Sequence, residues 1–213
     1  MTRALCSAVN YSHPMHTIEF FFDCSSPWTY LAFESIQPIA ARDDVTLEYK
    51  PILVGGIFNS VNPSVYENRA NPVPVKARYY QKDLQDWARL VGIRIGQPPV
   101  FPVNSVKVMR GALVAIEAGC LEAYARKVFQ RYWTELADIS LDEEVAAIAE
   151  AVGLDVEAFF EKINDPAYKD QLRDNTDEVM KRGGFGSPTM FVDRDDMYFG
   201  NDRIQLLTAR LDR

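Results

Sequence analysis

The sequence predicts an α/β protein in which both ends of the chain build one mixed β-sheet, with a large all-helical insertion between them. Three observations predict this fold. A β-α-β pattern occupies residues 17–50, helical periodicity runs over 75–182, and a β-β-α pattern follows residue 183. Because a sheet must be covered by other elements, the two strand-bearing ends are expected to meet. The 213 residues would then form one sheet domain from 17–74 and 183–213, and a helical insertion domain over 75–182.

The β-α-β unit begins with "TIEFFF", whose β-branched and aromatic content predicts a strand over Thr17–Phe22. Ser26 is a typical N-cap residue. Pro27 suits the first helical position, where its missing N–H has no intrahelical partner. Apolar spacing predicts a helix over 28–41, and alternating apolar and polar residues predict a second strand over Val45–Lys50.

The middle of the chain begins with residues 51–74, which are rich in Gly, Pro and Asn and predict an extended loop. A loop of that length is usually functional or ordered by a ligand. Helical periodicity follows, with Gly92 at a C-cap and Ser140 and Asp155 as N-caps. The expected helices span 76–92, 105–119, 121–136, 141–152, 155–162 and 166–181.

The C-terminal part begins with "RGGFG", which ends the helical block and leads into Pro188. It is not a phosphate loop, because no Lys-Ser/Thr follows it and a strand, not a helix, comes next. Short strands are predicted over Thr189–Asp193 and Met197–Phe199, joined as a hairpin. A final helix is expected to be capped by Asn201 or Asp202.

The composition argues against several classes of function. A net charge of −7 without a Lys/Arg run makes nucleic acid and anionic membranes poor partners. Cys6, Cys24 and Cys120 contain no Cys-x-x-Cys pair, which disfavours a disulfide framework and a zinc site and favours a reducing compartment. Cys24 is expected to be a buried filler.

The N-terminal segment lacks the apolar region of a secretory signal, and no apolar run reaches the roughly 18 residues of a membrane span. A cytoplasmic location is therefore expected. Both histidines, His13 and His16, precede the first predicted strand and would lie in a loose leader. Imidazole-dependent catalysis and metal binding are therefore not expected.

The turn "DCSSPWTY" is the strongest candidate for chemistry. A thiol–disulfide oxidoreductase carries Cys-Pro-x-Cys at such a strand-to-helix turn, whereas this chain has Ser26 and Thr29 at the two cysteine positions. Thr29 cannot resolve a mixed disulfide, so dithiol redox chemistry is disfavoured. Ser26 either only caps the helix or also stabilises an anion, with help from the free N–H groups and the dipole of the helix.

That anion could be the thiolate of a ligand. A free thiol has a pKa near 8.5, and lowering it by about two pH units takes about 2.7 kcal/mol. A hydroxyl hydrogen bond together with a helix N-terminus can supply this free energy. No histidine base accompanies Ser26, so a role as holder of a thiolate is favoured over a role as nucleophile.

Three other places carry candidate binding residues. The bond before Pro188 is either an ordinary trans bond, or a cis bond that turns the backbone of Ser187 outward to pair with an extended peptide. The turn Asn201–Arg203 either caps the last helix or receives an amino-acid-like group. Lys76, at a helix start, either faces an anion or is an ordinary exposed lysine.

Taken together, "FFFDCSSPWTYLAF", "KPILVGGIF", "VPVKARYYQKDLQDWARLVGI", "FPVN" and "GGFGSPTMFV…YFGNDRI" resemble one known family. They are similar to the 2-hydroxychromene-2-carboxylate isomerases and the kappa-class glutathione transferases, relatives of the bacterial disulfide oxidoreductases. The resemblance covers about residues 17–211. It implies a thioredoxin-like mixed sheet (β-α-β … β-β-α) with a large all-helical insertion, which is the layout predicted above from the residue patterns.

The resemblance also implies roles for individual residues. Ser26 would hold the thiolate of glutathione, and Ser187, before the family's cis-proline Pro188, would pair its backbone with the tripeptide. Lys76 would meet a glutathione carboxylate, and the γ-glutamyl end would bind Asn201, Asp202 and Arg203.

The loop after "GIF" departs from the family pattern, because "NSVNPSVYENRANPVP" is longer and lacks the usual "GNKPP". Asn62 and Asn71 are both candidates for the asparagine that contacts glutathione. Trp28 stands where the family has Tyr or Phe, and it either stacks on an aromatic substrate or packs internally; stacking is the favoured interpretation.

The function implied is a glutathione-dependent cis-trans isomerisation of an aromatic unsaturated 2-oxo acid, of the 2-hydroxychromene-2-carboxylate type, by reversible thiolate addition. Such a reaction belongs to aromatic degradation, and the family suggests a homodimer. One alternative is a kappa-type glutathione transferase or peroxidase that acts on another electrophile. Another is a non-catalytic thioredoxin-like module that binds extended peptides at the Ser187–Pro188 edge.

Overall fold

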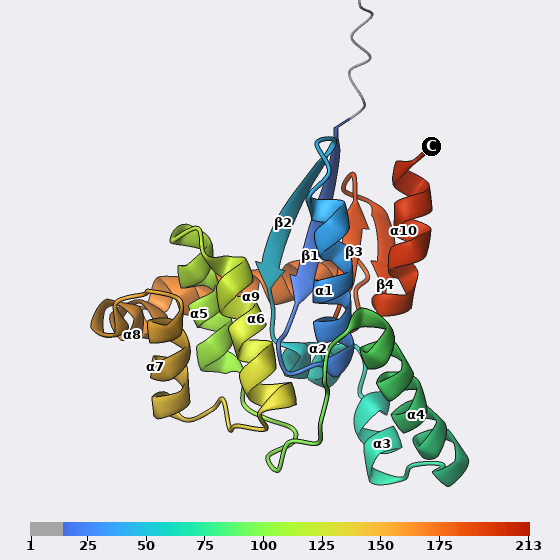
Figure 1. The fold of residues 1–213 in the computed structure, drawn as a ribbon, viewed down its shortest axis with the longest axis horizontal. Helices are drawn as coiled ribbons and strands as arrows, with labels where there is room; N and C mark the ends of the chain where they lie inside the picture. The colour runs from blue at the N-terminus through green and yellow to red at the C-terminus, as the bar shows by residue number, and fades with distance from the viewer. Residues whose placement is uncertain (1–14) are drawn as a thin grey trace, which may run out of the picture.

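The computed structural model describes residues 15–213, so Cys6 and His13 lie outside the described part. Four strands form one sheet in the order β2-β1-β3-β4 (Figure 1). Strand β1 (His16–Phe22) runs parallel to β2 (Val45–Pro51) and antiparallel to β3 (Thr189–Val192). Strand β4 (Asp196–Phe199) pairs with β3 as a hairpin. The two ends of the chain therefore share one mixed sheet, which confirms the predicted fold class.

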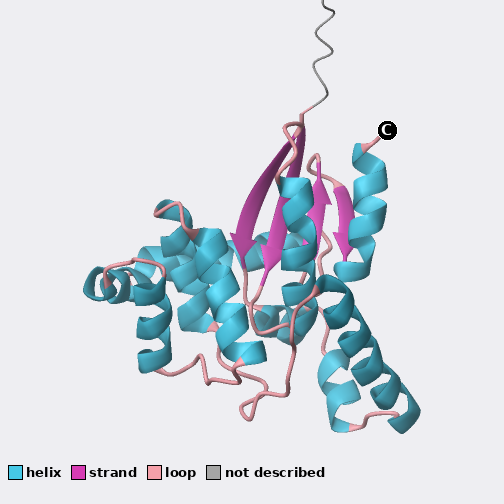
Figure 2. Ribbon diagram, viewed as in Figure 1, coloured by secondary structure: helices cyan, strands magenta, loops and turns pink. Residues whose placement is uncertain are grey.

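The described chain also contains ten α-helices and two short helical turns, some against the sheet and others extending away from it (Figure 2). They are α1 (Pro27–Ala40), α2 (Val54–Ser60), α3 (Ser64–Ala70), α4 (Pro74–Val91), α5 (Val106–Glu117), α6 (Leu121–Phe129), the π-helical turn Gln130–Thr134, α7 (Asp142–Ala151), α8 (Val156–Asn164), α9 (Pro166–Lys181), the 3-10 turn Asn201–Arg203 and α10 (Ile204–Leu211).

The run Phe20–Phe22 shows why the sheet needs cover on both faces, since all three phenylalanines are fully buried. Because side chains alternate along a strand, Phe20 and Phe22 belong to the main core, which includes residues of α1, α5 and α6. Phe21 faces the other way and packs in a smaller cluster that includes Val179 of α9. Helix α9 therefore covers the second face of the sheet.

This contact bears on the expected division of the chain. Helix α9 falls within the insertion as predicted (75–182), yet its last turns pack on the sheet through Val179. The domain boundaries stay a prediction.

Residues 51–74 are not an extended loop, and that prediction was wrong. They contain β2's last residue and the short helices α2 and α3. Distant side chains bind the N–H groups of the N-cap residue Leu53 and of Val54, the first residue of α2. Leu53 donates to Thr176 Oγ1 at 3.0 Å, and Val54 donates to Asp23 Oδ2 at 2.9 Å. These tertiary bonds offset the poor helix propensity of "VGG", and a local reading of the sequence does not reveal them.

Two predicted caps were also wrong, whereas others are confirmed. Ser140 does not cap α7, because Leu141 occupies the N-cap position and the Ser140 hydroxyl donates to Asp138 at 2.6 Å. Neither Asn201 nor Asp202 caps α10, since residues 201–203 form a 3-10 turn ahead of it and α10 has no side-chain cap bond. Ser26 and Asp155 do cap α1 and α8, and Gly92 ends α4 with φ 82°.

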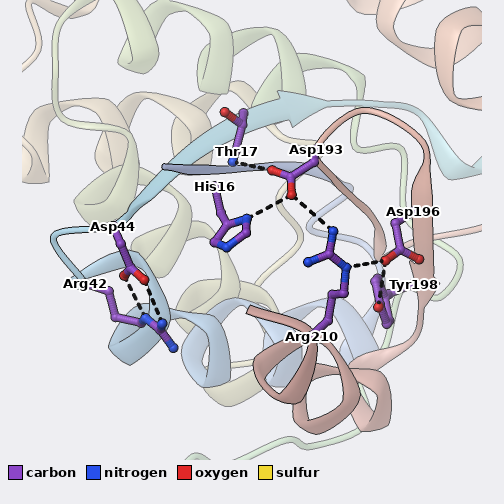
Figure 3. Close-up of polar contacts among 8 residues, drawn as sticks. All are labelled: His16, Thr17, Arg42, Asp44, Asp193, Asp196, Tyr198 and Arg210. Carbon is purple, nitrogen blue, oxygen red and sulfur yellow. Dashed lines mark hydrogen bonds and ion pairs between the residues drawn. The ribbon is translucent and has the colours of Figure 1, made fainter. Parts of the chain in front are cut away.

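His16 is the first residue of β1, so its placement in a loose leader was wrong. Its Nδ1 lies 2.8 Å from Asp193 Oδ2, and Asp193 also accepts from the backbone N–H of Thr17 and faces Arg210 (Figure 3). The seven-residue strand spans about 20 Å and separates this cluster from the Ser26 turn. The imidazole is therefore structural and remote from the candidate chemistry.

Within residues 15–213, no helix is both long and apolar enough to cross a membrane. The same part of the chain contains no group of three or more His, Cys, Asp or Glu side chains arranged to hold a metal ion.

Candidate functional site

A cavity of about 570 Å³ opens where β1 ends and α1 begins. This volume lies within the range of small-molecule sites. Segments that are far apart in sequence line it: the turn 23–28, α2 and α3 with their connection, residues 101–106, residues 185–187 and Phe199. Two of these segments were predicted to lie elsewhere: α2 and α3 fall in the region predicted as a long loop, and residues 101–106 fall in the predicted helical insertion. The cavity is therefore a product of tertiary folding.

Ser26 occupies the N-cap of α1 and lines this cavity. Its backbone is extended (φ −104°, ψ 124°), and its Oγ accepts a hydrogen bond from the Thr29 N–H at 3.3 Å. The hydroxyl in turn donates to the carbonyl oxygen of Ser187 at 3.2 Å. The same oxygen thus caps the helix and presents its proton at the cavity wall, so the two interpretations of Ser26 are compatible.

Ser187 links the end of the chain to this turn. Its peptide bond with Pro188 is cis, one of the two conformations considered above. Its Oγ accepts from the Asp23 N–H at 2.9 Å and lies 2.8 Å from Thr29 Oγ1. Thr29 is completely buried. The two hydroxyl positions that replace thiols therefore both contact Ser187, one through its carbonyl and one through its side chain.

Asp23 is a buried carboxylate that also lines the cavity, with only 1 % of its surface exposed. Oδ1 accepts from the Ser25 N–H at 2.9 Å, and Oδ2 accepts from the Val54 N–H at 2.9 Å and the Ser105 hydroxyl at 3.1 Å. Burial raises the pKa of this carboxyl, and the hydrogen bonds act in the opposite direction. Asp23 was not predicted from the sequence, because an aspartate beside a strand end carries no distinctive local signal.

One wall of the cavity combines aromatic rings with a cation. Arg69 of α3 lies over the rings of Phe58 and Phe101, at 5.5 and 5.2 Å from their centroids. Trp28 also lines the cavity, from the first turn of α1. Arg69 was not predicted from the sequence either, although "ENRAN" places an arginine in the segment that departs from the family pattern. A guanidinium at an aromatic wall is suited to an aromatic carboxylate.

Asn62 and Asn71 are separated by the structure. Asn62 lines the cavity, where its Nδ2 donates to the Phe185 carbonyl at 3.1 Å and its Oδ1 accepts from Ser64 at 2.8 Å. Asn71 occupies the C-cap of α3 and does not belong to the cavity lining. Asn62 is thus the better placed of the two candidates.

The remaining predicted binding residues lie outside the cavity lining. Lys76 is exposed in the first turn of α4, and Pro188 is buried beside Ser187. In the 3-10 turn before α10, Asn201 is buried, while Asp202 and Arg203 form an exposed ion pair with each other. The structure therefore brings together Ser26, Trp28, Asn62 and Ser187, but not the other predicted residues.

Cys24 is not part of the reactive surface, in line with its prediction as a buried filler. It is fully buried, and burial raises the pKa of its thiol well above the ordinary value. The charge of Asp23 raises this pKa further. Its backbone N–H points to Met109 Sδ at 3.3 Å, and its carbonyl accepts from Trp133 Nε1 at 2.9 Å. These contacts fix the turn that presents Ser26.

The fold and this turn define a thioredoxin-fold protein that carries hydroxyls at its thiol positions. The family model of the DSBA-like thioredoxin domain matches residues 17–212. The chain is 32% identical to the 2-hydroxychromene-2-carboxylate isomerase of Sphingobium xenophagum, over 92% of this chain and 97% of that protein. It is 29% identical to the human glutathione S-transferase kappa 1, over 92% and 90%. The chain therefore belongs to the 2-hydroxychromene-2-carboxylate isomerase and kappa-class glutathione transferase family, and it is an isomerase-like enzyme of that family.

Solved structures agree. A structure of a 2-hydroxychromene-2-carboxylate isomerase matches with a TM-score of 0.79 at 31% identity, over 92% of this chain and 95% of that one. A probable DsbA oxidoreductase from Streptomyces coelicolor matches with a TM-score of 0.75 at 20% identity, over 92% and 88% of the two chains. The second likeness, at this lower identity, shows the shared fold alone.

Proposed function

We propose that the protein is a glutathione-dependent cis-trans isomerase of an aromatic unsaturated 2-oxo acid, of the 2-hydroxychromene-2-carboxylate type. The observation that carries the proposal is the Ser26 hydroxyl, which caps α1 and opens on a cavity walled by aromatic rings and Arg69. The curated isomerases that the chain resembles over most of its length support the choice of reaction.

The turn around Ser26 fits a ligand that brings its own thiolate. The hydroxyl proton of Ser26 points toward the Ser187 carbonyl and can rotate toward an incoming sulfur. The hydrogen bond from the Thr29 N–H keeps the Ser26 oxygen in place. The N-terminus of α1 adds the positive end of its dipole. When bound, glutathione supplies a thiolate that adds reversibly to a conjugated double bond, which permits rotation before elimination restores the bond.

The cavity wall fits the second reactant. Arg69 would bind the substrate carboxylate, and its position over Phe58 and Phe101 limits its freedom before binding. Trp28 would stack on the aromatic ring of the substrate. Together these residues would orient the conjugated bond of the substrate toward Ser26. Positioning of the two reactants is the main contribution of a site of this kind to the rate.

Asn62 and Ser187 would contact glutathione from the cavity wall. The roles of Lys76, Asn201, Asp202 and Arg203 rest on the family resemblance, as do a homodimer and a cytoplasmic location. The tripeptide would have to extend beyond the cavity to meet these four residues.

A kappa-type glutathione transferase acting on another electrophile is the second candidate, favoured by the likeness to the human kappa enzyme. The test is to supply 2-hydroxychromene-2-carboxylate with and without glutathione and to follow products by NMR. The isomerase proposal predicts the trans isomer only when glutathione is present, with no conjugate accumulating. A persistent conjugate would favour the transferase, and no conversion at all would contradict this substrate class.

A further inference from the structure

The proposed reaction leaves one buried ionisable group of the cavity unused, the carboxylate of Asp23. It is almost inaccessible to solvent, and it accepts hydrogen bonds from the starts of α1 and α2 and from the segment before α5. A structural role would be to tie these three segments together. Asp23 also lines the cavity that is proposed to hold the glutathione thiolate, a second anion. The glutathione thiol must lose its proton to become that anion, and Asp23 is a candidate to receive it.

Electrostatic repulsion limits which protonation states the carboxylate and the thiolate can have together. A carboxylate and a thiolate in one buried cavity repel each other, and each also loses solvation. The pair then tends to retain one proton between its two members. Burial already raises the pKa of Asp23 before a ligand arrives, so the carboxyl is the member suited to take that proton.

Ser25 provides the connection. It lies between Asp23 and Ser26 in sequence and lines the same cavity. Its N–H donates to Asp23 Oδ1 at 2.9 Å, and its hydroxyl also lowers the pKa of that carboxyl through a hydrogen bond. The Ser105 hydroxyl contacts the other oxygen, Oδ2, and is not adjacent to Ser26.

We propose that Asp23 takes up the proton of the glutathione thiol, and that the Ser25 hydroxyl passes it on. The Ser25 Oγ accepts the proton as the S–H bond breaks and gives its own proton to Asp23 Oδ1, while the electron pair stays on the sulfur. The reverse transfer restores the thiol when glutathione leaves. This inference rests on the proposed use of glutathione, but it does not depend on the identity of the second substrate.

The test measures protons rather than turnover. Glutathione is titrated into the wild-type protein at neutral pH by calorimetry in buffers of different ionisation enthalpy, and the ultraviolet absorbance of the thiolate is recorded in parallel. We expect a thiolate to form with almost no proton released to the buffer. Asp23→Asn should instead release about one proton per bound glutathione. S-methyl glutathione, which has no thiol proton, gives the baseline.

Two further variants keep the result interpretable if Asp23→Asn fails to fold. Ser25→Ala should slow the formation of the thiolate after rapid mixing with glutathione, followed by its ultraviolet absorbance, because the path to Asp23 is broken while the carboxylate that receives the proton remains. Ser105→Ala is the matched control, which removes a different hydroxyl from the same carboxylate and should form the thiolate as fast as the wild type. A wild-type protein that forms the thiolate and releases about one proton would overturn the inference. So would a wild type that binds glutathione without ionising it, or a Ser25→Ala variant that forms the thiolate as fast as the wild type. Failure to bind glutathione at all would instead remove the proposed function.

Discussion

Ser26 combines a structural role with the proposed chemical role in one side chain. Its oxygen accepts the Thr29 N–H that would otherwise be unpaired at the helix start, and its proton is directed to the Ser187 carbonyl at the cavity wall. A cysteine-based relative of this fold would supply sulfur from this position. A hydroxyl cannot replace that sulfur as a nucleophile without a base, yet it can bind a thiolate that arrives with a ligand.

Replacement of Ser26 by alanine should separate these roles. We expect the rate of isomerisation to fall about 10²–10³-fold, as for the loss of one donor to a developing anion, while glutathione still binds. The free energy of unfolding should fall by about 1 kcal/mol from the lost cap. Asp155→Ala is the matched control, since it removes the cap of α8 away from the cavity. That variant should lose similar stability in urea unfolding and keep its activity; full activity in Ser26→Ala would count against the role.

Arg69 tests the proposed placement of the substrate. Arg69→Met should raise the KM for the oxo acid by about tenfold to hundredfold, because a charged hydrogen bond contributes about 1.5–3 kcal/mol. Glutathione affinity should not change. Arg89→Met removes an exposed arginine of α4 that pairs with Asp86, and its kinetics should match the wild type. Steady-state kinetics with each reactant varied would show whether the loss is confined to the oxo acid.

Asp23 makes stability depend on pH in a direction opposite to that of most carboxylates. Burial raises its pKa in the folded state, so the folded protein holds this proton more tightly than the unfolded chain. Its contribution to stability should therefore fall as the pH rises from the unfolded pKa, about 3.9, and level off above the folded pKa. Urea unfolding across this range should show that Asp23→Asn lacks the decline. Ser105→Ala removes a bond that lowers the pKa, so it should extend the decline to higher pH.

At the scale of elements, helices α5, α6 and α8 pack closely together, and α5 also contacts strand β2 of the sheet. Gly111 of α5 has no room for a side chain, because a Cβ would overlap the hydroxyl of Tyr124 and the ring of Phe159. Both aromatic residues are buried, and the Tyr124 hydroxyl donates to the Val108 carbonyl at 3.1 Å. The glycine thus allows two helices to approach α5 closely.

Gly111→Ala should lower the free energy of unfolding by about 1–3 kcal/mol, the usual cost of overpacking. Gly55 of α2 provides the contrast, since a Cβ there meets nothing within 4 Å. Gly55→Ala should leave stability unchanged or raise it by up to about 1 kcal/mol through helix propensity. Urea unfolding measures the free energy of unfolding of both variants. An equal decrease in the two would show that the close contact at Gly111 does not determine the stability of this packing.

Elements whose signals are local could be predicted from the sequence, and those fixed by distant partners could not. Ser26-Pro27, Gly92 and the alternation in β2 identify their elements because capping, backbone conformation and pleating act over a few residues. Helix α2 was missed because its start is held by Asp23 and Thr176, which come from other parts of the chain.

The same distinction holds for the whole molecule and its candidate site. Ser26 and Ser187 could be predicted as lying at the site because each stands beside a proline at a recognisable turn, and Trp28 was added by the family resemblance; all three line the cavity. Arg69 and Asp23 became candidates only when folding brought the separate segments around one cavity. Figure 1 shows the reason, since β1 and β3 come from opposite ends of the chain yet pair side by side in one sheet.

The proposed function requires this scaffold to hold the thiolate of glutathione beside Ser26. The decisive measurement is a calorimetric titration of the purified protein with reduced glutathione, beside its S-methyl analogue. We expect glutathione to bind and its S-methyl analogue to bind more weakly, because the hydroxyl and the N-terminus of α1 then meet no anion. Equal binding of the two ligands, or binding of neither, would contradict the proposed function.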